Sequence, residues 1–218
     1  MQPEQYDAWY TTPRGAWIGA VEYRLLDALL TPHHGETVLD VGCGTGHFTR
    51  RFSDDAVVGW TVGADVDFAA ARFAASRGKA AYLAADARSL PFADRSFDLV
   101  ISVTALCFMS DARRALMEML RVARRRVALG LLNRHSLLWF AKGRDGGRGA
   151  YRGAHWHTRR ELERLFAGQP ARNLALRTAV ILPGGGRLAR WAEPHLERAA
   201  PCCGAFLAAA ADVAPELH

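Results

Sequence analysis

The sequence predicts an α/β fold: a mostly parallel, doubly wound sheet with helices on both faces and an antiparallel pair of strands at one edge. Short apolar runs alternate with helical patterns between residues 37 and 132, which is typical of βαβ units. Two further apolar runs, residues 172–182 and 204–213, follow late in the chain and are expected to form the antiparallel pair. The length of 218 residues suits one domain with its own core.

Residues 5–30 are expected to be helical, with a break near Pro13 and Gly15, and Pro32 and Gly35 end that segment. Apolar residues recur there at helical spacing, as in Ile18, Val21 and Leu25. The expected parallel strands are residues 37–41, 57–66, 80–86, 96–103 and 125–132, with helices over about 46–52, 67–78 and 111–124.

Residues 133–156 break this rhythm with glycine and arginine, and we expect a mobile insertion there. A helix then begins at Thr158, where Glu161 three residues later completes a capping box. We therefore expect a single domain over residues 1–218. Its parts are a helical lid segment (1–35), a ligand-binding core (36–132), the insertion (133–156), and a last helix with the edge strands (157–218).

The composition excludes some classes of protein. No apolar run approaches the roughly 20 residues that span a bilayer, and the start lacks the order of a signal peptide, so we expect a cytoplasmic protein. The net charge of +6 permits nucleic-acid binding, but no aromatic ladder or zinc-finger motif accompanies it. We therefore expect most arginines to lie on solvent-exposed faces of helices. The spacing of the four cysteines fits neither a disulfide framework nor a C-x-x-C metal pair.

Three glycines, Gly42, Gly44 and Gly46, follow the first predicted strand in "VLDVGCGTG". Glycine loses the most backbone entropy on folding, so three at alternate positions indicate a tight turn or a ligand that leaves no room for Cβ atoms. The dinucleotide fingerprint G-x-G-x-x-G/A fails at its sixth position, which is His47, and the P-loop lysine is absent.

An aspartate stands at the end of each of the first three strands: Asp40, Asp65 and Asp86. Carboxyl ends of parallel strands meet at one edge of a sheet, where open α/β sheets bind ligands. Asp65 lies 23 positions after Gly42. At this spacing in the sequence, an acidic residue stands at the end of the second strand, where its carboxylate can accept hydrogen bonds from ribose hydroxyls. Asp67 is the alternative, although it better suits the N-cap of the following helix.

The segments "VLDVGCGTG", "VGAD" and "AADARSLPFADRSFDLVIS" resemble the class I methyltransferases that depend on S-adenosylmethionine, and most closely the type 11, ubiquinone-biosynthesis-like branch that acts on small molecules. The resemblance covers residues 38 to about 132. It implies a Rossmann-like, seven-stranded sheet and S-adenosylmethionine as cofactor. One departure is visible, because many relatives carry His-His after the fourth strand whereas this chain has "TALCFMS".

By that resemblance, Asp40 helps to hold the ammonium group of the cofactor and Asp65 binds the ribose. Asp86 takes the adenine amino group, the Ala87 N–H contacts the ring, and Ser102 and Val103 lie beside the transferred methyl. The implied cofactor-binding residues are Asp40, Gly42, Cys43, Gly44, Gly46, Asp65, Val66, Asp86, Ala87 and Ser102.

The expected reaction is in-line methyl transfer to a small-molecule acceptor, with alignment of the reactants as the protein's main contribution. The candidates for a general base are His135, His155 and Tyr10, with His157 beside them. The pair of histidines in "AHWHT" could bind a metal, but two ligands do not make a site, and none is predicted. The aromatic residues Tyr6, Trp9, Tyr10 and Trp17 either close the acceptor pocket or belong to the core.

Two alternatives remain at the level of the sequence: an RNA methyltransferase of the same fold and a non-catalytic regulator that binds S-adenosylmethionine. The absence of an RNA-binding domain disfavours the first, and the complete loop with its three acids disfavours the second. A nicotinamide oxidoreductase is disfavoured by His47. A homodimer is compatible with the sequence.

Overall fold

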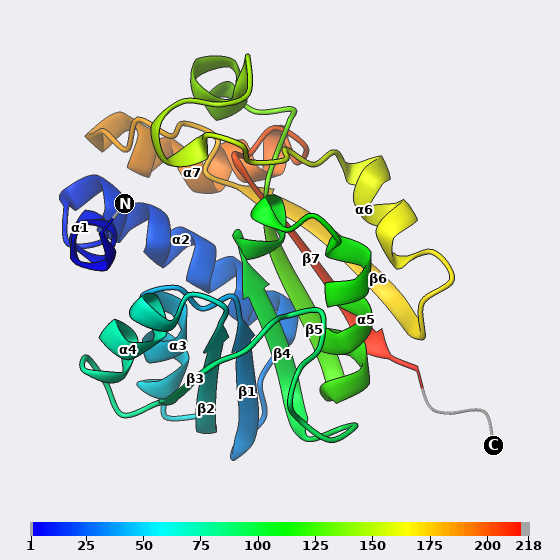
Figure 1. The fold of residues 1–218 in the computed structure, drawn as a ribbon. Coiled ribbons are helices and arrows are strands. Elements are labelled where there is room, and N and C mark those ends of the chain that lie inside the picture. Colours follow the sequence, from blue (N-terminus) through cyan, green and yellow to red (C-terminus); the bar gives the residue numbers. More distant parts are fainter. Residues whose placement is uncertain (1, 215–218) are drawn as a thin grey trace.

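The computed structural model describes residues 2–214 and has one seven-stranded sheet at its centre, in the order β3-β2-β1-β4-β5-β7-β6 (Figure 1). The strands are β1 (Glu36–Val41), β2 (Val58–Asp65), β3 (Ala81–Ala84), β4 (Phe97–Val103), β5 (Ala123–Leu132), β6 (Ala171–Ala179) and β7 (Phe206–Val213). The first five pair in parallel, and β7 runs antiparallel to both β5 and β6. The predicted fold class, with its antiparallel edge, is confirmed.

Seven α-helices connect these strands in the described part of the chain. They are α1 (Pro3–Trp9), α2 (Pro13–Leu30), α3 (His47–Ser53), α4 (Phe68–Ala75), α5 (Ala112–Val122), α6 (Arg159–Phe166) and α7 (Arg187–Ala199). The predicted break at Pro13 is where α2 begins. Asp67, Asp111 and Thr158 accept hydrogen bonds from the first N–H groups of α4, α5 and α6, because a short oxygen-bearing side chain satisfies donors that a helix start leaves unpaired.

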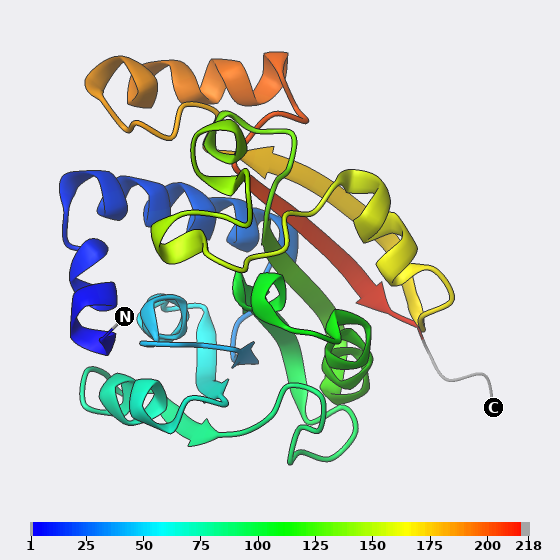
Figure 2. The ribbon, with the colours of Figure 1, turned by 45° about the horizontal axis from the view of Figure 1, so that its top comes forward.

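Helix α7 is not predicted by the sequence pattern, and it changes the connection between the two edge strands. Pro194 lies inside this helix, and proline normally ends a helical pattern. The edge strands are therefore joined by a helical excursion rather than by a tight turn. Figures 1 and 2 show α7 at the same end of the sheet as the insertion 133–156, which contains the short helices η2 (Trp139–Gly143) and η3 (Gly149–Tyr151).

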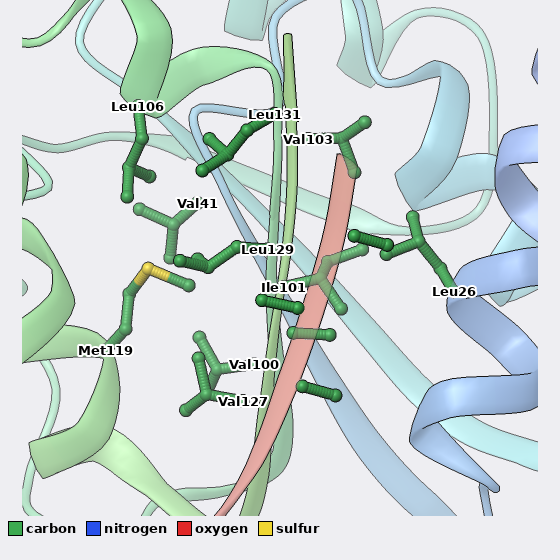
Figure 3. Close-up of a cluster of buried hydrophobic side chains, with 14 of the residues drawn as sticks. Leu26, Val41, Val100, Ile101, Val103, Leu106, Met119, Val127, Leu129 and Leu131 are labelled. Carbon is green, nitrogen blue, oxygen red and sulfur yellow. The ribbon is translucent and has the colours of Figure 1, made fainter. Parts of the chain in front are cut away.

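Apolar side chains fill both faces of the sheet, which fixes the strand ends that build the site. In Figure 3, Leu26 of α2 lies on one side of the strands and Met119 of α5 on the other, with Val100 and Ile101 of β4 between them. All four are fully buried. Burial of each contributes on the order of 1.5–3 kcal/mol. Within residues 2–214, no helix combines the length and the apolar character needed to cross a membrane.

Candidate functional site

A cavity of about 490 Å³ lies at the carboxyl ends of the parallel strands. Its walls come from segments that follow β1, β2, β3 and β4, and from α1 and the residue after it. Residues predicted from the sequence that line it are Asp40, Gly42, Cys43, Gly44, Asp65, Val66, Asp86, Ala87 and Tyr10. The parallel topology therefore brings together the strand-end acids and the glycine loop, as expected.

The loop between β1 and α3 requires glycine. Gly42, Gly44 and Gly46 have φ values of 73°, 53° and 78°, which are left-handed conformations that side chains with a Cβ avoid. A Cβ on Gly42 would lie 2.2 Å from the Cβ of Ala105. A Cβ on Gly46 would lie 2.6 Å from the Tyr82 hydroxyl oxygen, whereas one on Gly44 would meet nothing within 4 Å. Gly42 and Gly46 are thus fixed by packing, and Gly44 borders open space.

Asp65 holds this loop in place. Its Oδ2 accepts a hydrogen bond from the Gly44 N–H at 2.7 Å, and its Oδ1 accepts one from the Asp67 N–H at 2.8 Å. Asp67 caps α4 through its own side chain. Asp65 lines the cavity and Asp67 does not, as the sequence predicts.

Asp40 is buried in the floor of the cavity, with 2% of its surface exposed. The Thr49 hydroxyl donates to its Oδ2 at 2.6 Å. Burial raises the pKa of Asp40 to about 7, because a charged carboxylate loses its hydration there, and the hydrogen bond from Thr49 only partly offsets this. A cationic ligand beside Asp40 would restore its ionised form.

Asp86 is half-buried at the rim, where Arg88 approaches it with two nitrogens. Arg88 Nη2 donates to Oδ2 at 2.7 Å, and Arg88 Nε lies within 3.1 Å of both oxygens. The hydrogen bonds from this guanidinium lower the pKa of Asp86 to about 2. The carboxylate therefore stays ionised and keeps lone pairs that can accept from an amino group. Arg88 was not predicted, although its position two residues after Asp86 is visible in the sequence.

His47 and Tyr10 form one wall of the cavity. Their rings stack with centroids 3.6 Å apart and an angle of 9° between the planes. A Cβ on Gly19 of α2 would lie 2.8 Å from His47 Nε2, so this stack is packed directly against α2. His47, which breaks the dinucleotide fingerprint, therefore serves to close the cavity against the N-terminal helices.

The three predicted candidates for a general base lie in different places. Tyr10 lines the cavity, but burial raises the pKa of its hydroxyl well above the ordinary value, so it keeps its proton at neutral pH. His135 lines a separate cavity of about 500 Å³ beside Thr158. His155 lines neither cavity, and its backbone N–H donates to the Cys107 carbonyl. The structure brings only Tyr10 to the cofactor cavity.

Ser102 lies away from the cavity, in contrast to the prediction. Its side chain is fully buried, and its hydroxyl donates to the Val41 carbonyl at 2.7 Å, which ties β4 to β1. Successive side chains of a strand point to opposite faces, and of the two residues expected beside the methyl group only Val103 lines the cavity. Thr104 follows in a left-handed conformation with φ of 59° and also lines it.

The residues that line the cavity offer groups that suit S-adenosylmethionine. Two buried polar atoms of residues that line the cavity, Thr45 Oγ1 and His47 Nε2, have no hydrogen-bond partner. Buried polar atoms without partners are uncommon. His47 Nε2 packs against Gly19 of α2, so of these two atoms the Thr45 hydroxyl is the candidate partner for a ligand in the cavity. Asp40 supplies a carboxylate for a cationic group, and the exposed Val66 supplies an apolar surface for a ring.

Comparisons with known proteins agree with this geometry. Residues 39–129 match the family described as a methyltransferase domain. An uncharacterised protein of Mycobacterium tuberculosis (strain ATCC 25618 / H37Rv) is 34% identical over 196 residues, which cover 85% of this chain and 63% of that protein. The malonyl-[acyl-carrier protein] O-methyltransferase of Pectobacterium atrosepticum is 40% identical over 104 residues, which cover 46% of this chain and 39% of that enzyme. The chain thus spans less than two thirds of the length of these curated relatives.

A solved structure with the same fold is a SAM-dependent methyltransferase of Thermotoga maritima, described as a "possible histamine N-methyltransferase". Its TM-score is 0.75 at 22% identity, and the match covers 96% of this chain and 94% of that one. This likeness concerns the fold. The matched segment, residues 39–129, also supplies most of the residues that line the cavity, so this part of the chain is similar in sequence, and the whole described chain in fold, to methyltransferase domains.

Proposed function

We propose that the protein binds S-adenosylmethionine in the 490 Å³ cavity and transfers its methyl group to a small-molecule acceptor. The observation that carries the proposal is the convergence of Asp40, Asp65 and Asp86 with the glycine loop on one cavity. When bound, S-adenosylmethionine supplies an electrophilic methyl group on a positively charged sulfur. We also propose that this enzyme is cytoplasmic and that its acceptor is not a nucleic acid.

Each acid has its own part in binding. Asp40 would accept from the ammonium group, since it is the buried carboxylate of the floor. Asp65 would accept from the ribose hydroxyls while it continues to hold the loop through the Gly44 N–H. Asp86 would accept from the adenine amino group at the rim. Gly44 leaves room for the methionine part because no Cβ stands there.

The acceptor side of the cavity is aromatic and apolar. Tyr6, Tyr10, Phe108 and Met109 line it, and Phe108 is half exposed. Such a wall suits a flat or apolar acceptor and excludes water from the reacting atoms. Tyr10, which keeps its proton, would donate a hydrogen bond that orients the acceptor rather than act as a base.

Glu22 of α2 is the residue that we propose as proton acceptor if the reaction needs one. Glu22 lies one helical turn after Gly19, against which Tyr10 and His47 pack, and it does not itself line the cavity. When ionised, it raises the pKa values of Tyr6 and Tyr10. Burial raises the pKa of Glu22 to about 8, close to the value that suits a base at neutral pH. No sequence signal marks Glu22, because it lies inside an ordinary helical pattern.

The test begins with cofactor binding, measured by titration calorimetry with S-adenosylmethionine and S-adenosylhomocysteine. Asp65→Asn should weaken both ligands at least tenfold, because an amide replaces one acceptor oxygen by a donor. Asp67→Asn is the matched control, since asparagine also caps a helix and Asp67 does not line the cavity. Equal affinities for the wild type and Asp65→Asn would refute the site.

Turnover is then tested by incubating the protein with labelled S-adenosylmethionine and pools of phenols, amines, thiols and carboxylic acids. Transfer to a small molecule whose rate rises with pH up to about 8 in the wild type, and which is slower and lacks that rise in Glu22→Gln, would support the acceptor side as described. Transfer to total RNA and to none of these pools would favour the RNA methyltransferase instead. Tight binding without transfer to any pool would favour the regulator.

A further inference from the structure

Three side chains with metal-binding atoms converge outside the cofactor cavity: His155, His157 and Glu161. One nitrogen of each imidazole and one carboxylate oxygen of Glu161 all lie within 4.8 Å of one another. None of the three lines the cofactor cavity. We propose that this cluster binds a divalent transition-metal ion of the zinc type, independently of S-adenosylmethionine.

The backbone of the two histidines is fixed by neighbouring elements. The His157 N–H donates to the Leu132 carbonyl at 2.8 Å, and the His157 carbonyl accepts from the Arg134 N–H at 2.9 Å, so this residue runs beside the end of β5. The His155 N–H donates to the Cys107 carbonyl at 2.7 Å in η1 (Ala105–Phe108). Because side chains two apart in an extended segment share one side, both imidazoles face the same space, with ring centroids 4.5 Å apart.

Glu161 completes the set through the capping box of α6. Its Oε2 accepts from the Thr158 N–H at 2.6 Å, and its own N–H donates to Thr158 Oγ1 at 3.2 Å. Its Oε1 lies 3.7 Å from His155 Nε2. One oxygen thus anchors the carboxylate while the other faces the histidines. The predicted capping box therefore also aims a ligand atom.

An independent observation points to a missing partner. The side chain of His157 is buried, with only 6% of the residue exposed, and its Nε2 is a buried atom without a hydrogen-bond partner. Buried polar atoms are nearly always satisfied by protein, water or a bound ion. An ion between the two imidazoles and Glu161 would give this nitrogen its partner.

The donor set selects the class of ion. Two imidazole nitrogens and one carboxylate oxygen match the three-ligand sites of zinc, and imidazole also suits Co²⁺, Ni²⁺ and Cu²⁺, whereas Mg²⁺ and Ca²⁺ prefer oxygen alone. Zinc–ligand distances of about 2.0–2.2 Å put neighbouring ligand atoms about 3.3–3.6 Å apart, so the cluster contracts on binding. The His155 side chain is 57% exposed and free to make that movement.

The carboxylate is decisive for this site because it lies at the start of a helix. The N-terminus of α6 carries partial positive charge, which opposes a cation. The negative charge of Glu161, in the first turn of α6, offsets both the partial charge of the helix N-terminus and the charge of the ion. Neutral imidazoles cannot supply such a charge. Removal of its charge should therefore weaken the ion at least as strongly as loss of one histidine.

Binding would tie together three segments, one of which, η1, belongs to the wall of the cofactor cavity. The cluster joins the end of the insertion 133–156 to α6, and its backbone reaches η1 through Cys107. The same η1 carries Phe108, which lines the cofactor cavity. We therefore expect the ion to raise the thermal midpoint of unfolding.

The test is calorimetric titration of the tag-free full chain with ZnCl₂, and with CoCl₂ followed by visible absorption. The background is Cys202→Ser with Cys203→Ser, so that zinc bound by these two exposed thiols would not be counted as the site. One ion per chain is expected, with weakening of at least tenfold in His155→Gln and in Glu161→Gln. Glutamine at position 161 keeps the capping box, so the fold of α6 is retained.

His33→Gln is the matched control, since His33 and Glu36 form a His–Glu pair at 3.4 Å that belongs to no group of three ligand residues in the described part of the chain. Its zinc affinity should equal that of the parent. Affinity for S-adenosylmethionine should be unchanged in His155→Gln and Glu161→Gln, which separates this proposal from the proposed function. Absence of a one-to-one site below about 100 μM Zn²⁺, or equal affinities in the parent, His155→Gln and Glu161→Gln, would overturn it.

Discussion

Asp40→Asn should stabilise the fold at neutral pH while it weakens cofactor binding. Burial raises the pKa of Asp40 from 3.8 in the unfolded chain to about 7 in the folded protein. Between these values the folded state holds a proton that the unfolded state has released, so stability falls as the pH rises through this window. Asparagine has no proton to release, and its Oδ1 can still accept from the Thr49 hydroxyl.

The size of the effect follows from the same values. A pKa difference of about 3 corresponds to about 4 kcal/mol of destabilisation once the pH is above 7. At pH 5 the folded carboxyl is still protonated, and the penalty is smaller, on the order of 2 kcal/mol. The stability difference between Asp40→Asn and the wild type should therefore grow by about 2–3 kcal/mol in favour of the variant between pH 5 and pH 8.

Urea unfolding of both proteins at pH 5, 6, 7 and 8 measures this difference. Asp67→Asn serves as control, because Asp67 is an exposed cap and its variant should track the wild type at each pH. A difference between Asp40→Asn and the wild type that stays constant from pH 5 to pH 8 would refute the buried, protonated carboxyl. A separate titration with S-adenosylmethionine should show at least tenfold weaker binding in Asp40→Asn.

Two further predictions concern Gly42 in the loop after β1 and Ser102 in β4. Gly42→Ala should cost roughly 2–4 kcal/mol in urea unfolding, because its Cβ would lie 2.2 Å from the Cβ of Ala105 at a φ of 73°. Gly35→Ala, at a φ of 82° with nothing within 4 Å, should cost only about 1–2 kcal/mol, and equal costs would contradict the close approach. Ser102→Ala should lose about 1–2 kcal/mol with the bond to the Val41 carbonyl, while affinity for S-adenosylmethionine changes less than twofold. A large loss of affinity with unchanged stability would return Ser102 to the cofactor site.

The sequence by itself determined the fold class and most of the cofactor side of the site. The alternation of apolar strands with helical patterns encodes a parallel sheet, and in such a sheet the carboxyl ends of strands meet at one edge. Asp40, Asp65 and the glycine loop could therefore be placed together without coordinates. The caps at Asp111 and Thr158 were also readable, because capping depends on residues only three positions apart.

Only the tertiary structure decided the rest. Helix α7 was missed because Pro194 breaks the local pattern that predicts helices. Ser102 was misplaced because alternation along β4 determines which side chain enters the cavity, and one position exchanges the faces. Tyr10 stacks on His47, which lies in a distant part of the chain. Glu161 of α6 approaches His155, which lies before that helix. Local propensity carries no information about such contacts, because packing between elements fixes them.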